Sequence, residues 1–189
     1  MSLDLVDPLH DERSRLLEKA IILAMVAHER HSIRPSKRWR KSLPGTPYFV
    51  HPVWCATMFV QEPSIEEELR FHGACALALH DVLEDTHISL PRDFPLEVRN
   101  LVEEMTVPKS PNRPTTQIEI DHLASKSEAV ILLKLFDKTA NALDGPQSWM
   151  EGRWPLHRAL LASLVDLNTP RYPDLIVLRI AIDILNRNP

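Results

Sequence analysis

The chain of 189 residues contains only four glycines and two cysteines. Scarce glycine disfavours tight β-hairpins, whereas the 16 prolines suit helices joined by proline-containing loops. Two cysteines are too few for a disulfide framework, which indicates a reducing cytoplasm as the compartment. The acidic first residues are not typical of a secretory signal. No run of roughly 18 apolar residues occurs, so we expect no helix that spans a membrane.

The charge balance argues against a nucleic-acid-binding protein. The chain has 22 Lys and Arg against 26 Asp and Glu, a net charge of −4. Residues 34–41 form a basic stretch, but Trp39 is its only aromatic residue, so an RNA-binding patch is also disfavoured. Apolar residues make up 44% and charged residues 25%, values typical of a soluble globular protein. Since no repeat or linker divides the chain, we expect one domain over residues 1–189.

Apolar residues recur at three- and four-residue steps, which predicts an all-α, single-domain helical bundle. We expect helices over residues 12–31, 50–61, 64–85, 95–106, 116–125, 128–143, 156–167 and 173–186. The third of these contains small apolar residues at 73–79 that let a neighbour approach closely, so it is the predicted central helix. Ser64 is its predicted N-cap, with Glu67 as the capping-box partner. Cys55 and Cys75 lie on apolar helix faces and are expected in the core.

One imidazole and three carboxylates gather near the end of the predicted central helix, at His80, Asp81, Glu84 and Asp85. On a continuous helix these side chains would form one stripe. Burying three like charges without a cation is costly, so the stripe must face either solvent or a metal. A mixed set of imidazole and carboxylate ligands suits Mn²⁺, Fe²⁺ or Zn²⁺.

Two residues elsewhere have the chemistry to complete a metal site. His51 follows a proline-rich turn at the start of a predicted helix. Asp137 interrupts an apolar run and shares a helix face with Asn141. Each has a simpler explanation as well. His51 could be a core histidine, and Asp137 could pair with Lys134 or Lys138 on a solvated face.

Four segments, in this order, carry a family resemblance. They are Arg40-Lys41 upstream of Gly45-Thr46-Pro47-Tyr48-x-x-His51-Pro52, then Ala78-Leu79-His80-Asp81-Val82-Leu83-Glu84-Asp85-Thr86, then Leu101-Val102-Glu103-Glu104-Met105-Thr106, and finally Lys134-Leu135-x-Asp137-Lys138-x-x-Asn141. The chain resembles the HD-domain phosphohydrolases, and specifically the hydrolase domain of the RelA/SpoT alarmone enzymes and their small stand-alone SpoT-like relatives. The resemblance covers roughly residues 16–143 and implies a helical bundle of the HD-domain type.

The resemblance also implies an activity and its residues. One divalent metal, Mn²⁺ in this family, would be bound by His51, His80, Asp81 and Asp137. Glu84 and Asp85 would position and deprotonate the attacking water and assist the leaving group. The nucleotide pocket would be lined by Arg40, Lys41 and Asn141. The implied reaction removes the 3′-pyrophosphate from guanosine 3′,5′-bis-pyrophosphate or its pentaphosphate form, giving GDP or GTP and pyrophosphate.

Some positions depart from the family pattern and leave alternatives open. Phe94-Pro95 stands where the family usually has Phe-Gly, and the residues after Asn141 lack the arginine commonly found there. An adenosine alarmone or another 3′-phosphorylated nucleotide is therefore an alternative substrate. A catalytically silent nucleotide sensor or partner-binding scaffold is the alternative function. The Glu84-Asp85 pair favours an enzyme, because a binding protein has no need of a general base. The sequence leaves the oligomeric state open.

Overall fold

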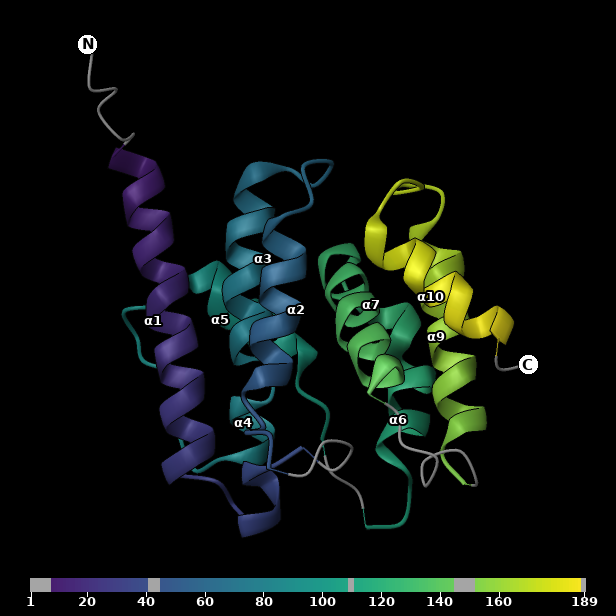
Figure 1. Ribbon diagram of the computed structural model, residues 1–189, viewed down its shortest axis with the longest axis horizontal. Helices are drawn as coiled ribbons and strands as arrows, with labels where there is room; N and C mark the ends of the chain where they lie inside the picture. Colours follow the sequence, from purple (N-terminus) through teal and green to yellow (C-terminus); the bar gives the residue numbers. More distant parts are fainter. Residues whose placement is uncertain (1–7, 41–44, 109–110, 145–151, 188–189) are drawn as a thin grey trace.

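The computed structural model describes residues 8–40, 45–108, 111–144 and 152–187 (Figure 1). Within these ranges the secondary structure is helical, and the only β-type pairings are two isolated bridges, Ser32 with Thr86 and Trp39 with Pro47. The prediction of an all-α fold is therefore confirmed. None of the helices in these ranges has the length and apolar character needed to cross a bilayer.

The helices lie close to the predicted ranges, with one exception discussed below. In chain order they are α1 (Pro8–Arg30), the 3₁₀ helix η1 (Pro35–Arg38), α2 (Val50–Val60), α3 (Glu67–Leu79), α4 (Val82–Asp85), α5 (Leu96–Met105), α6 (Thr115–His122), the 3₁₀ helix η2 (Leu123–Ser125), α7 (Glu128–Leu143), α9 (Trp154–Asn168) and α10 (Ile176–Arg187). The first helix begins four residues earlier than predicted, at Pro8, because proline is tolerated in the first turn of a helix.

Helix α3 is the central helix, as predicted, and it packs against α1, α2, α5 and α7. Figure 1 shows α1 on one side, α2 and α3 in the middle, and α7, α9 and α10 on the other side. The approach of α2 to α3 is close at Gly73, where a Cβ atom would lie 2.5 Å from Cε1 of Phe59. Cys55 and Cys75 are fully buried in the core, which confirms that prediction.

The predicted continuous helix over residues 64–85 is wrong, because it divides at His80 and Asp81. Helix α3 ends at Leu79, and the short helix α4 starts at Val82. The chain after α4 is tied instead to the segment after α1. The amide of Ile33 donates to the carbonyl of Asp85 at 2.9 Å, and the amide of His87 donates to the carbonyl of His31 at 3.0 Å. These tertiary contacts set the direction of the chain, so the four residues do not form one helical stripe.

The predicted capping box at the start of α3 is also wrong. The N-cap is Glu66, whose carboxylate accepts hydrogen bonds from the amides of Glu68 and Leu69, both at 3.0 Å. A carboxylate at this position satisfies two amides and faces the positive end of the helix dipole. Ser64 lies two residues before the cap, and Glu67 instead pairs with Arg13 at 2.6 Å.

Candidate active site

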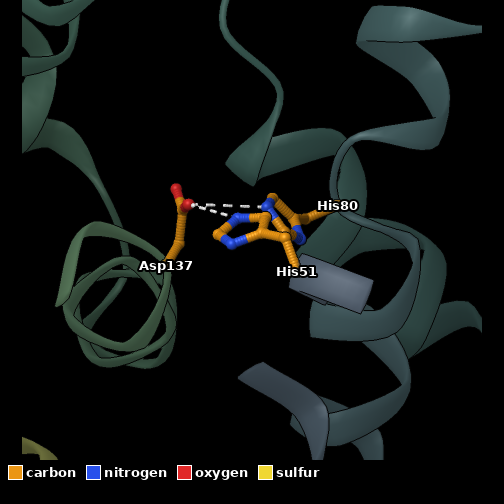
Figure 2. Close-up of side chains that lie close together, drawn as sticks. All are labelled: His51, His80 and Asp137. Atoms are coloured by element: carbon orange, nitrogen blue, oxygen red, sulfur yellow. Dashed lines mark hydrogen bonds and ion pairs between the residues drawn. The ribbon is translucent and has the colours of Figure 1, made fainter. Parts of the chain in front are cut away.

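Three buried side chains converge from different helices (Figure 2). His51 lies in the first turn of α2, His80 directly follows α3, and Asp137 lies within α7. Oδ1 of Asp137 is 3.2 Å from Nε2 of His51 and 3.5 Å from Nε2 of His80. One ligand atom from each residue lies within 4.8 Å of the other two. The structure thus brings three of the four predicted metal ligands together.

The orientation of His80 is fixed by the backbone of α3. Its Nδ1 lies 2.7 Å from the carbonyl oxygen of Leu77. Because a carbonyl only accepts, Nδ1 carries a proton and Nε2 faces the centre of the site. Nε2 is buried without a hydrogen-bond partner of its own. A histidine held through one nitrogen, with the other directed at neighbouring ligands, is the arrangement found in metal sites.

The fourth predicted ligand, Asp81, lies beside this group rather than within it. Its Oδ2 is 3.2 Å from Nε2 of His80 and accepts a 2.7 Å hydrogen bond from the hydroxyl of Tyr48. The sequence analysis assigned Tyr48 no role, although it stands three residues before His51 in the matched motif. The partly buried ring of Tyr48 also contacts the rings of His28 and His51, at centroid distances of 4.9 and 6.2 Å.

The site is electrostatically suited to a cation. Burial raises the pKa of the Asp137 carboxyl, but the charges of Lys138 and His80 outweigh burial and hold it well below its usual range. Burial likewise opposes ionisation of Asp81, and the charge of His80 lowers its pKa on balance. Burial lowers the pKa of His80, but the two carboxylates raise it well above its ordinary value. Two ionised carboxylates and two imidazoles form a donor set that fits a divalent metal.

Asp137 is held by partners on both of its oxygens. The side-chain amide of Asn141 donates to Oδ1 at 2.6 Å, and Nζ of Lys138 lies 2.9 Å from Oδ2. The alternative that Asp137 pairs with a neighbouring lysine is correct for Lys138, but the predicted solvated face is not. The side chain of Asp137 is 4% exposed and that of Lys138 is 13% exposed. Lys134 pairs instead with Glu119 of α6, at 2.7 Å.

The two predicted catalytic carboxylates lie on α4, the short helix that follows His80 and Asp81. Oε1 of Glu84 accepts a 2.8 Å hydrogen bond from the amide of Val107, which ties α4 to the chain after α5. Burial and the charge of Asp81 raise the pKa of Glu84 to about 6. A carboxylate with a pKa close to neutrality suits general-base catalysis. Asp85 is buried at the end of the same helix.

A cavity of about 220 Å³ opens beside His51. Arg40 lines it, forms an ion pair with Asp144 and lies with its guanidinium carbon 5.6 Å from the ring centre of Tyr48. The cavity is also lined by Trp54, one helical turn after His51, a position that the sequence analysis did not single out. The structure therefore places Arg40 next to the converging residues. Lys41, the other predicted basic ligand, lies outside the described residues.

Comparisons with known proteins identify the family. The chain is 32% identical over 146 residues to guanosine-3′,5′-bis(diphosphate) 3′-pyrophosphohydrolase MESH1 of Xenopus tropicalis, an alignment that covers 72% of this chain and 78% of that protein. The chain belongs to this family of SpoT-like HD-domain hydrolases. MESH1 of Mus musculus is 33% identical over 150 residues, covering 75% of the chain and 78% of the relative. MESH1 of Homo sapiens is 34% identical over 122 residues, or 60% of the chain and 66% of the relative.

The solved structures agree with this membership. A metazoan ortholog of SpoT that hydrolyses ppGpp superposes with a TM-score of 0.67 at 25% sequence identity. The superposition covers 91% of this chain and 94% of that structure. No protein-family model matches the chain. The HD-type fold implied by the sequence resemblance is thus confirmed by relatives in both sequence and structure.

Proposed function

We propose that this chain is a metal-dependent hydrolase that removes the 3′-pyrophosphate from guanosine 3′,5′-bis(diphosphate), or from its pentaphosphate form. The products are GDP or GTP and pyrophosphate. Relatives that carry this activity in their names support the proposal, at 32% to 34% identity. The observation that carries it is the convergence of His51, His80 and Asp137, with Nε2 of His80 directed at the carboxylate of Asp137.

We propose that the metal is Mn²⁺ and that its ligands are His51, His80, Asp81 and Asp137. When bound, a divalent metal supplies positive charge for the phosphoryl oxygens and lowers the pKa of a bound water. The side chains of this protein carry out the proton transfer and assist the leaving group. Glu84 accepts the proton of the attacking water, because its pKa of about 6 leaves it ionised and still basic near neutral pH. Asp85 assists departure of the leaving group.

The substrate is a polyanionic nucleotide, and its proposed binding residues are Arg40, Lys41 and Asn141. The proposal is supported by the cavity that Arg40 lines together with His51. Guanidinium groups recognise phosphates through paired hydrogen bonds and stack on planar rings, so Arg40 suits either part of a nucleotide. We place the reaction in the cytoplasm and treat residues 1–189 as one hydrolase domain.

A nucleotide panel with pyrophosphate detection tests the proposal. The purified chain is supplied with Mn²⁺ and given guanosine 3′,5′-bis(diphosphate), its pentaphosphate form or the corresponding adenosine nucleotide. We expect pyrophosphate release from the guanosine substrates, loss of release with a chelator, and loss in Asp137→Ala. If pyrophosphate is released only from the adenosine nucleotide, the substrate is an adenosine alarmone and not a guanosine one. Binding without release from any of them would favour a nucleotide sensor.

A further inference from the structure

Four charged side chains form a buried network of ion pairs between α6 and α7. Glu119 lies on α6, while Lys134, Asp137 and Lys138 lie on α7. Their side chains are between 4% and 13% exposed. Oε1 of Glu119 is 2.7 Å from Nζ of Lys134 and 2.8 Å from Nζ of Lys138. Two positive and two negative charges therefore balance one another inside the protein.

The two lysines differ in what they contact beyond Glu119. Lys134 pairs with Glu119, and that single pair would satisfy both charges. Lys138 contacts Glu119 and also Oδ2 of Asp137, the residue whose Oδ1 faces both imidazoles. The two oxygens of Asp137 thus have separate partners, because Lys138 engages one and the converging histidines lie near the other. Together with the hydrogen bond from Asn141 to Oδ1, this contact restrains rotation of the carboxylate about its last bond.

A lysine next to a metal ligand has an electrostatic cost. Its positive charge opposes a nearby cation in an environment of low dielectric constant. Glu119 lies within ion-pair distance of the same ammonium group and offsets this charge. Lys138 can therefore direct the carboxylate of Asp137 without strongly repelling the metal.

We propose that Lys138 is a positioning residue that holds Oδ2 of Asp137, so that Oδ1 faces the metal, and that Glu119 keeps Lys138 in place and offsets its charge. This inference rests on the metal site of the proposed function but not on the identity of the nucleotide. It assigns a role in metal affinity to Glu119, a residue of α6 whose side chain contacts the ligand Asp137 only through Lys138.

Mn²⁺ affinity of the full chain, measured by calorimetry after removal of bound metal, tests the proposal without any substrate. Loss of a residue that orients a metal ligand typically weakens binding about 10–100-fold. We expect a loss of this size in Lys138→Met. Lys134→Met is the matched control, because Lys134 is one helical turn away on α7 and shares Glu119 but is not an ion-pair partner of Asp137. We expect its affinity to stay within about threefold of wild type.

Other outcomes overturn the inference in distinct ways. If Lys138→Met binds Mn²⁺ as tightly as wild type, the contact has no positioning role, while the proposed function stands. If Lys134→Met loses as much Mn²⁺ affinity, the buried charges affect metal binding only by stabilising the fold, and Lys138 has no positioning role. Should Lys138→Met fail to fold, judged by circular dichroism, Glu119→Gln decides, since weaker Mn²⁺ binding is expected and unchanged binding refutes the role. A wild type that binds Mn²⁺ but releases no pyrophosphate contradicts only the proposed function.

Discussion

The hydroxyl of Tyr48 donates a 2.7 Å hydrogen bond to Oδ2 of Asp81, the same oxygen that lies 3.2 Å from Nε2 of His80. Burial and the charges of Asp81 and Asp85 raise the pKa of Tyr48 well above its usual value, so the hydroxyl keeps its proton and remains a donor. Asp81 is thus held from one side by a phenol and from the other by an imidazole. Tyr48 thus orients Asp81, a predicted metal ligand for which the sequence analysis named no hydrogen-bond donor.

Replacing Tyr48 with Phe keeps the ring and removes only this donor. The metal-free protein should lose about 1.5–3 kcal/mol of unfolding free energy, the usual range for a hydrogen bond to a charged group. Urea denaturation measures the change. Tyr172→Phe is the control, because Tyr172 is the other tyrosine of the chain and its hydroxyl forms no hydrogen bond with the residues that the structure describes. Equal stability of Tyr48→Phe and wild type would contradict a role for the phenol in holding Asp81.

Mn²⁺ should stabilise the folded protein by mass action. At a hundredfold excess over Kd the gain is about 2.7 kcal/mol, provided that the unfolded chain does not bind the ion. His80→Ala should lose this gain, because it removes the nitrogen that Leu77 orients toward the site. His72→Ala, on α3 two turns earlier, should retain it. The measurement is the thermal unfolding midpoint with and without Mn²⁺, and a wild type that responds to neither Mn²⁺ nor chelator would exclude the metal site.

Glu84→Gln separates catalysis from metal binding. The substitution removes the proposed base, so the rate of pyrophosphate release should fall roughly 10²–10⁴-fold while Mn²⁺ stays bound. Wild-type activity should decline below about pH 6, where Glu84 takes up a proton. Steady-state rates across pH, with Mn²⁺ binding measured at each pH, provide the check. Full turnover in Glu84→Gln would leave the enzyme in place but assign its base to another residue.

Ionisation of Glu84 serves catalysis but lowers the stability of the fold. A carboxyl whose pKa rises from 4.5 to about 6 on folding stabilises the fold fully below pH 4.5, and this contribution is lost as the pH rises through 6. Glu84→Gln, which stays neutral, should therefore exceed wild type by about 2 kcal/mol at pH 8 and match it near pH 4. Urea denaturation of the metal-free proteins at both values tests the sign. A variant that is less stable at pH 8 would contradict it.

Much of the fold could be predicted because periodicity reports which residues are buried. The small residues of α3 indicated a central helix, and Gly73 is where Phe59 makes the close contact. The end of α3 could not be predicted, because hydrogen bonds between residues 85–87 and 31–33 redirect the chain, and no local pattern encodes them. For the same reason sequence spacing placed Asp81 on a shared helical stripe, whereas the turn after Leu79 places it beside Tyr48.

The partners of the site were harder to predict than its centre. His51, His80 and Asp137 stood out because imidazoles and carboxylates are unusual in apolar segments. The sequence offered Lys138 as a partner of Asp137 only on a solvated face, because its ion pair with Glu119 of α6 forms only in the folded chain. Long-range ion pairs of this kind leave no periodic signal.

Arg40 provides the test of the nucleotide pocket. Its guanidinium lines the cavity beside His51, is 8% exposed and pairs with Asp144. If it also binds the nucleotide, Arg40→Met removes a charged hydrogen-bond donor worth about 1.5–3 kcal/mol, or roughly a 10–100-fold rise in KM. Mn²⁺ affinity should not change, because Arg40 is not among the converging ligands.

Asp144→Asn shows whether the effect of Arg40→Met is only structural. This variant breaks the same ion pair but leaves the guanidinium free to meet the substrate. We therefore expect Asp144→Asn to keep KM within about threefold of wild type or to lower it, since Arg40 no longer has to leave a charged partner. Steady-state pyrophosphate release from guanosine 3′,5′-bis(diphosphate) gives KM for both variants. A similar rise in KM in both would mean that the pair supports the fold of the pocket, and that Arg40 makes no direct contact with the nucleotide.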